Sequence, residues 1–241
     1  MSMRSIGYSF NNAIADIIDN SITAEADLIK IQCLWNGEVP TIEIEDNGKG
    51  MSENELIEAM RPGSKSPLSS RSNEDLGRFG LGLKTASFSQ CKKLIVKTFQ
   101  DKLINEASWD LDIVQEQNKW FLDLENSKEN TTNLKTGTII RWEKIDTLSN
   151  KNKEDAEETF NSMVSNLGKH IGITFHRYIN GDKRKINFIV NGIKCEAFDP
   201  FFKEKSTPLP IELIKNQLIS CEIRGFTLPN KNKCTEKEWD Y

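Results

Sequence analysis

Three segments decide the fold of this chain: NNAIADIIDNSITA (residues 11–24), TIEIEDNGKGM (41–51) and GRFGLGLKTAS (77–87). The first repeats apolar residues at helical spacing from Ala13 to Ile22, which predicts an amphipathic helix. The second alternates apolar and polar residues up to Asp46 and then turns at glycines, which predicts a strand with a tight turn behind it. The third leads from glycine turns into another helix.

The segments around these three predict an α+β fold. LIKIQCLW (28–35) predicts a strand, SENELIEAM (52–60) a helix that opens with a capping box, and residues 61–75 a long loop. Further strands are expected at 93–99, 103–110, 120–124 and 137–145, and a helix that breaks near Gly172 at 154–179. Beyond residue 183 we expect a hairpin at Asn191-Gly192 and a strand at 218–228.

Composition excludes several classes of protein. The net charge of −4 argues against a chain-wide basic surface for nucleic acid. No apolar run is long enough to cross a bilayer, so no membrane partner is expected. The five cysteines show no CxxC pair, which argues against zinc and favours reduced thiols in the cytoplasm. With only two histidines, the composition favours chemistry by carboxylate, amide, lysine and backbone groups over histidine chemistry.

The first helix carries Asp16 and Asn20 on a polar face, four positions apart. In a cleft, this pair offers a carboxylate that activates water and an amide oxygen for a hard cation such as Mg²⁺. On a plain surface helix the same two side chains would simply be solvated. The pair alone leaves both readings open.

The strand 41–46 ends at Asp46, which can accept a hydrogen bond from an exocyclic amine. Gly48 and Gly50 let the backbone approach a flat ring closely. A hairpin turn explains the same residues, and both interpretations stay open.

The segment GRFGLGLK opens a helix behind three glycines, where backbone N–H groups form an anion site. Arg78 and Lys84 add positive charge for phosphates. The segment is neither a Rossmann fingerprint, because a polar loop precedes it, nor a Walker A loop, because the GK[ST] ending is missing.

In this order, the motifs resemble those of the GHKL, or Bergerat-fold, ATPase superfamily, which includes gyrase B-type subunits, heat-shock chaperones, sensor histidine kinases, MutL and MORC proteins. AIADIIDNSITA is similar to the N-box, DNGKGM to the D-x-G-x-G box, and GRFGLGLKTAS to the glycine-rich end of the ATP lid in MORC-like proteins. Gly137-Thr138 resembles the late glycine–threonine box. The resemblance covers roughly residues 8–145.

The resemblance implies a two-layer α/β sandwich, with helices on one face of a mixed sheet, in an ATP-binding domain at residues 1–182. The start of a β-rich, transducer-like region is expected at 183–241, with too few residues for a complete domain.

The resemblance also implies Mg²⁺ and ATP as ligands and a role for each matching residue. Asp16 would be the general base, Asn20 the Mg²⁺ ligand, and Asp46 the residue that reads the adenine amine, with Thr138 helping through water. The other implied nucleotide contacts are Gly48, Gly50, Met51, Ser64, Lys65, Gly77, Arg78, Phe79, Gly80, Leu81, Gly82 and Lys84.

One departure from the superfamily concerns the general base, which is usually glutamate and here is Asp16. Its carboxylate sits about 1.5 Å further back, and a misplacement of about 1 Å lowers a rate on the order of a hundredfold. We therefore expect slow hydrolysis. In gyrase- and MutL-like relatives a lysine from the following domain reaches the γ-phosphate. The tail of this chain has several basic residues, but none can be matched to that lysine: Lys183, Arg184, Lys185, Lys203 and Lys205.

The leading hypothesis is a slow ATPase that acts as a conformational switch. ATP would drive homodimerisation, and the work would be done on DNA or a partner protein, in DNA processing or defence. A nucleotide-binding regulatory module without hydrolysis is the alternative that Asp16 keeps open. A histidine-kinase-type phosphotransferase is the weaker one, because no phosphoacceptor helix precedes the N-box.

Overall fold

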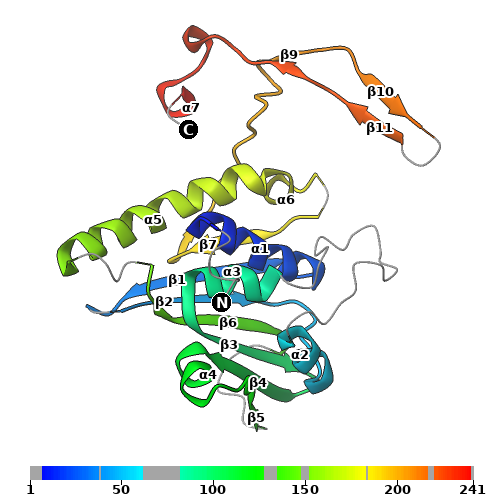
Figure 1. The fold of residues 1–241 in the computed structure, drawn as a ribbon. Coiled ribbons are helices and arrows are strands. Elements are labelled where there is room, and N and C mark those ends of the chain that lie inside the picture. Colours follow the sequence, from blue (N-terminus) through cyan, green and yellow to red (C-terminus); the bar gives the residue numbers. More distant parts are fainter. Residues whose placement is uncertain are drawn as a thin grey trace.

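The computed structural model describes residues 7–37, 39–61, 82–127, 135–147, 152–182, 184–216 and 220–239. Its main body is one sheet covered by helices (Figure 1). The strands of this sheet are β1 (Leu28–Trp35), β2 (Pro40–Asp46), β3 (Cys91–Gln100), β4 (Leu103–Asp110), β5 (Asp123–Ser127), β6 (Gly137–Ile145), β7 (Asn187–Val190) and β8 (Ile193–Lys194). The helices around it are α1 (Phe10–Thr23), α2 (Glu53–Met60), α3 (Gly82–Gln90), α4 (Leu111–Gln117), α5 (Lys153–Thr174) and α6 (His176–Asn180).

The sheet is mixed, with the strand order β5-β4-β3-β6-β2-β1-β7-β8. Neighbouring strands are antiparallel, except that β7 runs parallel to β1. Of the expected site residues, Asp46 on β2 and Thr138 on β6 lie opposite each other in the middle of this sheet.

Helix α1 lies in the layer that covers the sheet (Figure 1) because one of its faces is mainly apolar. Ala13, Ile14, Ile17 and Ile18 are fully buried. Ser9 caps the helix by accepting a hydrogen bond from the Asn12 N–H group. Burial of four such side chains is the main reason that a 14-residue helix is stable here.

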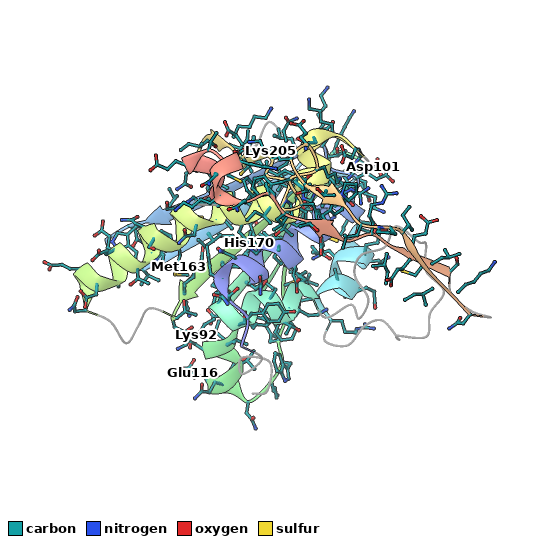
Figure 2. All side chains as sticks on the ribbon, turned by 90° about the horizontal axis from the view of Figure 1, so that it is seen from above. Lys92, Asp101, Glu116, Met163, His170 and Lys205 are labelled. Atoms are coloured by element: carbon teal, nitrogen blue, oxygen red, sulfur yellow. The ribbon has the colours of Figure 1, made fainter. Side chains whose placement is uncertain are left out.

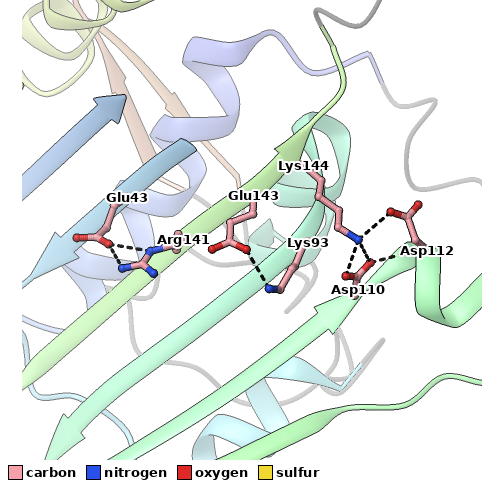
Figure 3. Close-up of polar contacts among 7 residues, drawn as sticks. All are labelled: Glu43, Lys93, Asp110, Asp112, Arg141, Glu143 and Lys144. Atoms are coloured by element: carbon pink, nitrogen blue, oxygen red, sulfur yellow. Dashed lines mark hydrogen bonds and ion pairs between the residues drawn. The ribbon is translucent and has the colours of Figure 1, made fainter. Parts of the chain in front are cut away.

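The other face of the sheet carries rows of charged side chains and a small buried apolar cluster of Phe99, Ile104 and Ile139. Along β2, Ile42, Ile44 and Asp46 point toward the helices, so Glu43 points away from them. Figure 3 shows the pairs on this outer face: Glu43 with Arg141, Lys93 with Glu143, and Lys144 with Asp110 and Asp112. Such exposed pairs add little stability, but they keep the face hydrophilic. The expected two-layer α/β sandwich is therefore confirmed.

Most elements expected from the sequence are confirmed within a few residues, and the capping box of α2 is present. The hairpin at Asn191-Gly192 is also confirmed, since β7 pairs with β8 around two residues of positive φ. The strand expected at 120–124 was placed too early and α4 was missed. Asp110 caps α4, and β5 begins only at Asp123.

The long C-terminal helix breaks at Phe175 instead of near Gly172, because α5 continues through Thr174 before α6 begins. The strand expected at 218–228 is two short strands of different sheets. The last elements are β9 (Thr207–Pro208), β10 (Glu212–Lys215), β11 (Ser220–Ile223), β12 (Phe226–Thr227), a 3-10 turn (Lys231–Lys233) and α7 (Glu236–Trp239).

The residues after 182 belong to two different parts of the structure. Strands β7 and β8 complete the main sheet, whereas β10 pairs with β11 and β9 with β12 in small sheets that stand apart from it (Figure 1). The division of the chain at 182/183 stays a prediction. No helix in the described ranges is both long enough and apolar enough to span a bilayer.

Two glycines are required by the backbone at the centre of the sheet. Gly137 and Gly50 both have positive φ, and a Cβ atom on either would overlap a carbonyl oxygen, that of Asp46 or of Phe99. We predict that Gly137→Ala lowers the free energy of unfolding by about 2–4 kcal/mol, because backbone strain and overpacking add.

Gly168→Ala is the matched control for this substitution, because Gly168 lies in α5 with open space around its Cβ position. It should raise stability by about 0.5–1 kcal/mol. Urea denaturation of both variants checks this, and equal stabilities would contradict the packing described.

Candidate functional site

A row of buried polar residues crosses the middle of the sheet on its helix-covered face. Asp46, Thr138, Thr98 and Asn105 lie side by side on β2, β6, β3 and β4. All four are buried, beneath helices whose core-facing side chains are mainly apolar. Buried polar groups cost free energy unless they are hydrogen-bonded, so a row of four at one level of the sheet is a candidate functional surface.

The carboxylate of Asp46 is the charged member of this row and is only 4% exposed. Burial raises its pKa, although three donors oppose the rise: the Gly48 N–H group, the Ser21 hydroxyl and the Thr138 N–H group. The Gly48 and Ser21 bonds are 2.9 and 2.8 Å long. A carboxylate offers about four lone-pair positions, so one acceptor position is left for a donor such as an exocyclic amine.

The glycine turn after Asp46 is packed against the neighbouring elements. A Cβ atom on Gly48 would lie 2.6 Å from the carbonyl oxygen of Ala24, at the end of α1. Behind the turn, the Met51 N–H group donates to Thr98 Oγ1 at 2.8 Å, and Asn105 Nδ2 donates to the Met51 carbonyl at 3.5 Å. The turn is thus shaped by backbone contacts that only glycine permits.

Helix α1 brings Asp16, Asp19 and Asn20 close together. Asn20 Nδ2 donates to the backbone carbonyl of Asp16 at 3.0 Å, so the amide oxygen is the atom left to coordinate a cation. The Tyr8 hydroxyl donates to Asp16 Oδ2 at 2.7 Å, and this bond raises the pKa of Tyr8. Burial and the charge of Asp16 raise the pKa of Asp19 to about 6. Asp19 is therefore close enough to Asp16 for the two carboxylates to repel each other.

Lys84 occupies a buried position at the start of α3. Its ammonium group donates to the carbonyls of Ala59 and Arg61, both at 2.7 Å, at the C-terminal end of α2. Further along α3, the Ser87 hydroxyl accepts a hydrogen bond from Trp142 Nε1 at 2.8 Å and ties α3 to β6. Lys84 thus joins α3 to the end of α2, and its expected contact with phosphates stays a prediction.

Seven predicted nucleotide contacts lie outside the described residues, so the structure places only the remaining site residues. The seven are Ser64, Lys65, Gly77, Arg78, Phe79, Gly80 and Leu81.

Several residues of this site were not predicted from the sequence. Ser21, Thr98 and Asn105 hold the predicted residues in place, and Tyr8 contacts Asp16. Thr98 and Asn105 carried a signal, since each is a polar residue at an inward position of an alternating strand. Ser21 carried a weaker one, because it stands beside Asn20 but on the buried side of the helix.

A cavity and two basic side chains lie away from the row of buried polar residues on the sheet. A cavity of about 670 Å³ is lined by the start of α1 and by α5 residues such as Asp155 and Met163. Figure 2 labels Met163 and His170 on α5 and Lys205 beyond it. Lys205 pairs with Glu238, and Arg184 donates to backbone carbonyls behind α1. In this conformation both basic groups are engaged in contacts of their own.

Comparisons with known proteins agree with this geometry. The family described as histidine kinase-, DNA gyrase B- and HSP90-like ATPases matches residues 8–139, which is more than half of the chain. The chain belongs to this family. The mixed sheet with helices on one face is consistent with the family's Bergerat fold, and the chain is of the ATP-binding ATPase class.

This ATPase domain is also similar to ATPase morc-1 of Caenorhabditis elegans, with 31% identity over 93 residues. The match covers 39% of this chain and 10% of the nematode protein. The chain therefore spans about a tenth of the length of that relative, and the similarity to MORC proteins is distant.

The neighbouring carboxylates of α1 predict a pH-dependent stability for this ATPase domain. Because the folded pKa of Asp19 is about 6 and the ordinary value is 3.8, ionised Asp19 destabilises the fold above pH 6, and the penalty disappears below about pH 4. Asp19→Asn should therefore raise the free energy of unfolding at pH 7.5 by about 1 kcal/mol, since solvent screening of this half-buried group reduces the effect.

The control for this prediction is Glu116→Gln, at an exposed position of α4 that is labelled in Figure 2. Urea denaturation at pH 7.5 and pH 4 measures both variants. A gain for Asp19→Asn that persists at pH 4 would contradict the assignment.

Proposed function

We propose that this chain binds Mg-ATP against the polar row of the sheet and hydrolyses it slowly, and that bound ATP drives a conformational or dimerisation switch. The observation that carries the proposal is the buried carboxylate of Asp46, which keeps one acceptor position beside a turn that only glycines permit. That arrangement suits a flat base with one exocyclic amine. Membership of the ATPase family supports the same ligand.

The polar side of α1 would hold the phosphate end of the nucleotide. The amide oxygen of Asn20 and water would hold Mg²⁺, which needs few protein ligands. When bound, the ion neutralises charge on the phosphates. The first turn of α3, which begins at Gly82, offers backbone N–H groups to the phosphates.

Hydrolysis requires a water molecule to attack the γ-phosphorus. As the bond from the water oxygen to phosphorus forms, the bond from phosphorus to the β–γ bridging oxygen breaks, and ADP leaves. Asp16 would accept the proton that the water loses. Its shorter side chain makes this step slow, since a misplacement of about 1 Å lowers a rate on the order of a hundredfold.

A nucleotide-binding module without hydrolysis is the second candidate, and one observation favours it. The Asp16 side chain is one methylene shorter than the glutamate that is usual at this position of the family. Tight ATP binding by isothermal titration, with no phosphate released, would establish this candidate.

The switch and its setting are the less direct part of the proposal. By analogy with MORC and MutL proteins, two ATP-bound chains would associate through their N-terminal parts, and the work would be done on DNA or a partner protein in the cytoplasm. Light scattering with a non-hydrolysable ATP analogue tests the association. A monomer at saturating analogue would refute the dimer.

The proposed adenine site can be tested by measuring ATP binding. Asp46→Asn should lower ATP affinity at least about tenfold, because an amide nitrogen replaces one acceptor oxygen in a crowded site. Thr41→Val, on the outer side of β2, is the control and should bind ATP normally. Isothermal titration measures both, and unchanged affinity for Asp46→Asn would refute the adenine site.

The roles proposed for α1 can be tested by measuring ATP binding and ATP turnover separately. Asp16→Asn should bind ATP with near-normal affinity but release phosphate at least about a hundredfold more slowly, because it removes the general base. Asn20→Ala should weaken Mg-ATP binding and turnover together. Normal turnover in both variants would refute the roles assigned to α1.

A further inference from the structure

Tyr8 lies two residues before α1, yet its hydroxyl reaches Asp16 Oδ2 at 2.7 Å. Asp16 stands six residues beyond Phe10, roughly 9 Å along the helix axis. Side chains of a helix lean toward its N-terminus, so the Asp16 carboxylate leans back toward Tyr8. The aromatic ring packs against the main core cluster, and the hydroxyl is therefore carried by a side chain that is itself anchored.

The backbone of Tyr8 is anchored as well. Its carbonyl accepts a hydrogen bond from Gln90 Nε2 at 3.2 Å, and Gln90 is a buried residue at the end of α3. The next residue, Ser9, caps α1. The two helices that carry the polar face and the phosphate end of the site thus fix the position of Tyr8 between them.

The geometry points to Tyr8 as a positioning residue for ATP hydrolysis: its hydroxyl holds Asp16 Oδ2 and leaves Oδ1 to accept the proton of the attacking water. The inference rests on the proposed function, which gives Asp16 its role as a base. A short carboxylate has little reach to correct its own position, so its orientation must be set by a neighbour. A neutral phenol sets that orientation through one hydrogen bond and places no charge beside the carboxylate.

Tyr8→Phe tests this directly, because it keeps the ring and its packing and removes only the hydroxyl. We expect kcat for ATP to fall about tenfold, with KM, ATP affinity and melting temperature unchanged. Tyr178→Phe is the matched control, since Tyr178 is a partly buried tyrosine in α6. It should retain wild-type kcat.

A double-mutant comparison distinguishes positioning from general damage. In the Asp16→Asn background, Tyr8→Phe should cause no further loss in single-turnover phosphate release. An equal loss in both backgrounds, a change in ATP affinity alone, or an unchanged kcat in Tyr8→Phe would each overturn the role of Tyr8 while the proposed function stands. A wild-type chain that binds ATP but releases no phosphate would instead reject hydrolysis, and the role of Tyr8 with it.

Discussion

The site depends on one buried carboxylate, that of Asp46. A charge in an apolar core is very costly unless it is hydrogen-bonded, and Asp46 receives its donors from three different elements: Ser21 of α1, the turn residue Gly48 and Thr138 of β6. Each donor also fixes the element that carries it. The same bonds that make the charge tolerable therefore hold α1 against the sheet and set the shape of the turn.

The glycines follow from this constraint. Since Gly48 lies against the end of α1 and Gly137 against the backbone of Asp46, a side chain at either position would push the carboxylate away from its donors. Thr98 and Asn105 complete the arrangement from the other side by holding the backbone of Met51. Residues 46–51 thus have a structural role besides the proposed ligand-binding one. For this reason a hairpin turn alone also explained their sequence.

Much of this could be predicted from the sequence, for identifiable reasons. Helix α1 and strands β2 and β6 follow from apolar spacing, because each buries one complete face. Helix α4 was missed because its capping residue, Asp110, is also the last residue of β4 and continues the alternation of apolar and polar residues in that strand. The contacts of Tyr8 and Lys84 could not be predicted, since they depend on how chain segments far apart in sequence meet. The alternation of β3 and β4 did contain Thr98 and Asn105, and a search for inward polar residues would have found them.

Two carboxylates of this domain, those of Asp46 and Asp19, are still disfavoured as ions by their surroundings in the fold. Burial disfavours ionised Asp46, and burial together with the charge of Asp16 disfavours ionised Asp19. The proposed ligand would compensate both charges. Its adenine amine would donate a further hydrogen bond to Asp46, and its Mg²⁺ would place a cation beside Asp19 on α1. A ligand that relieves these penalties binds the folded chain far better than the unfolded one and must stabilise it. Under the proposed function, these two carboxylates would therefore link nucleotide binding to the stability of the fold.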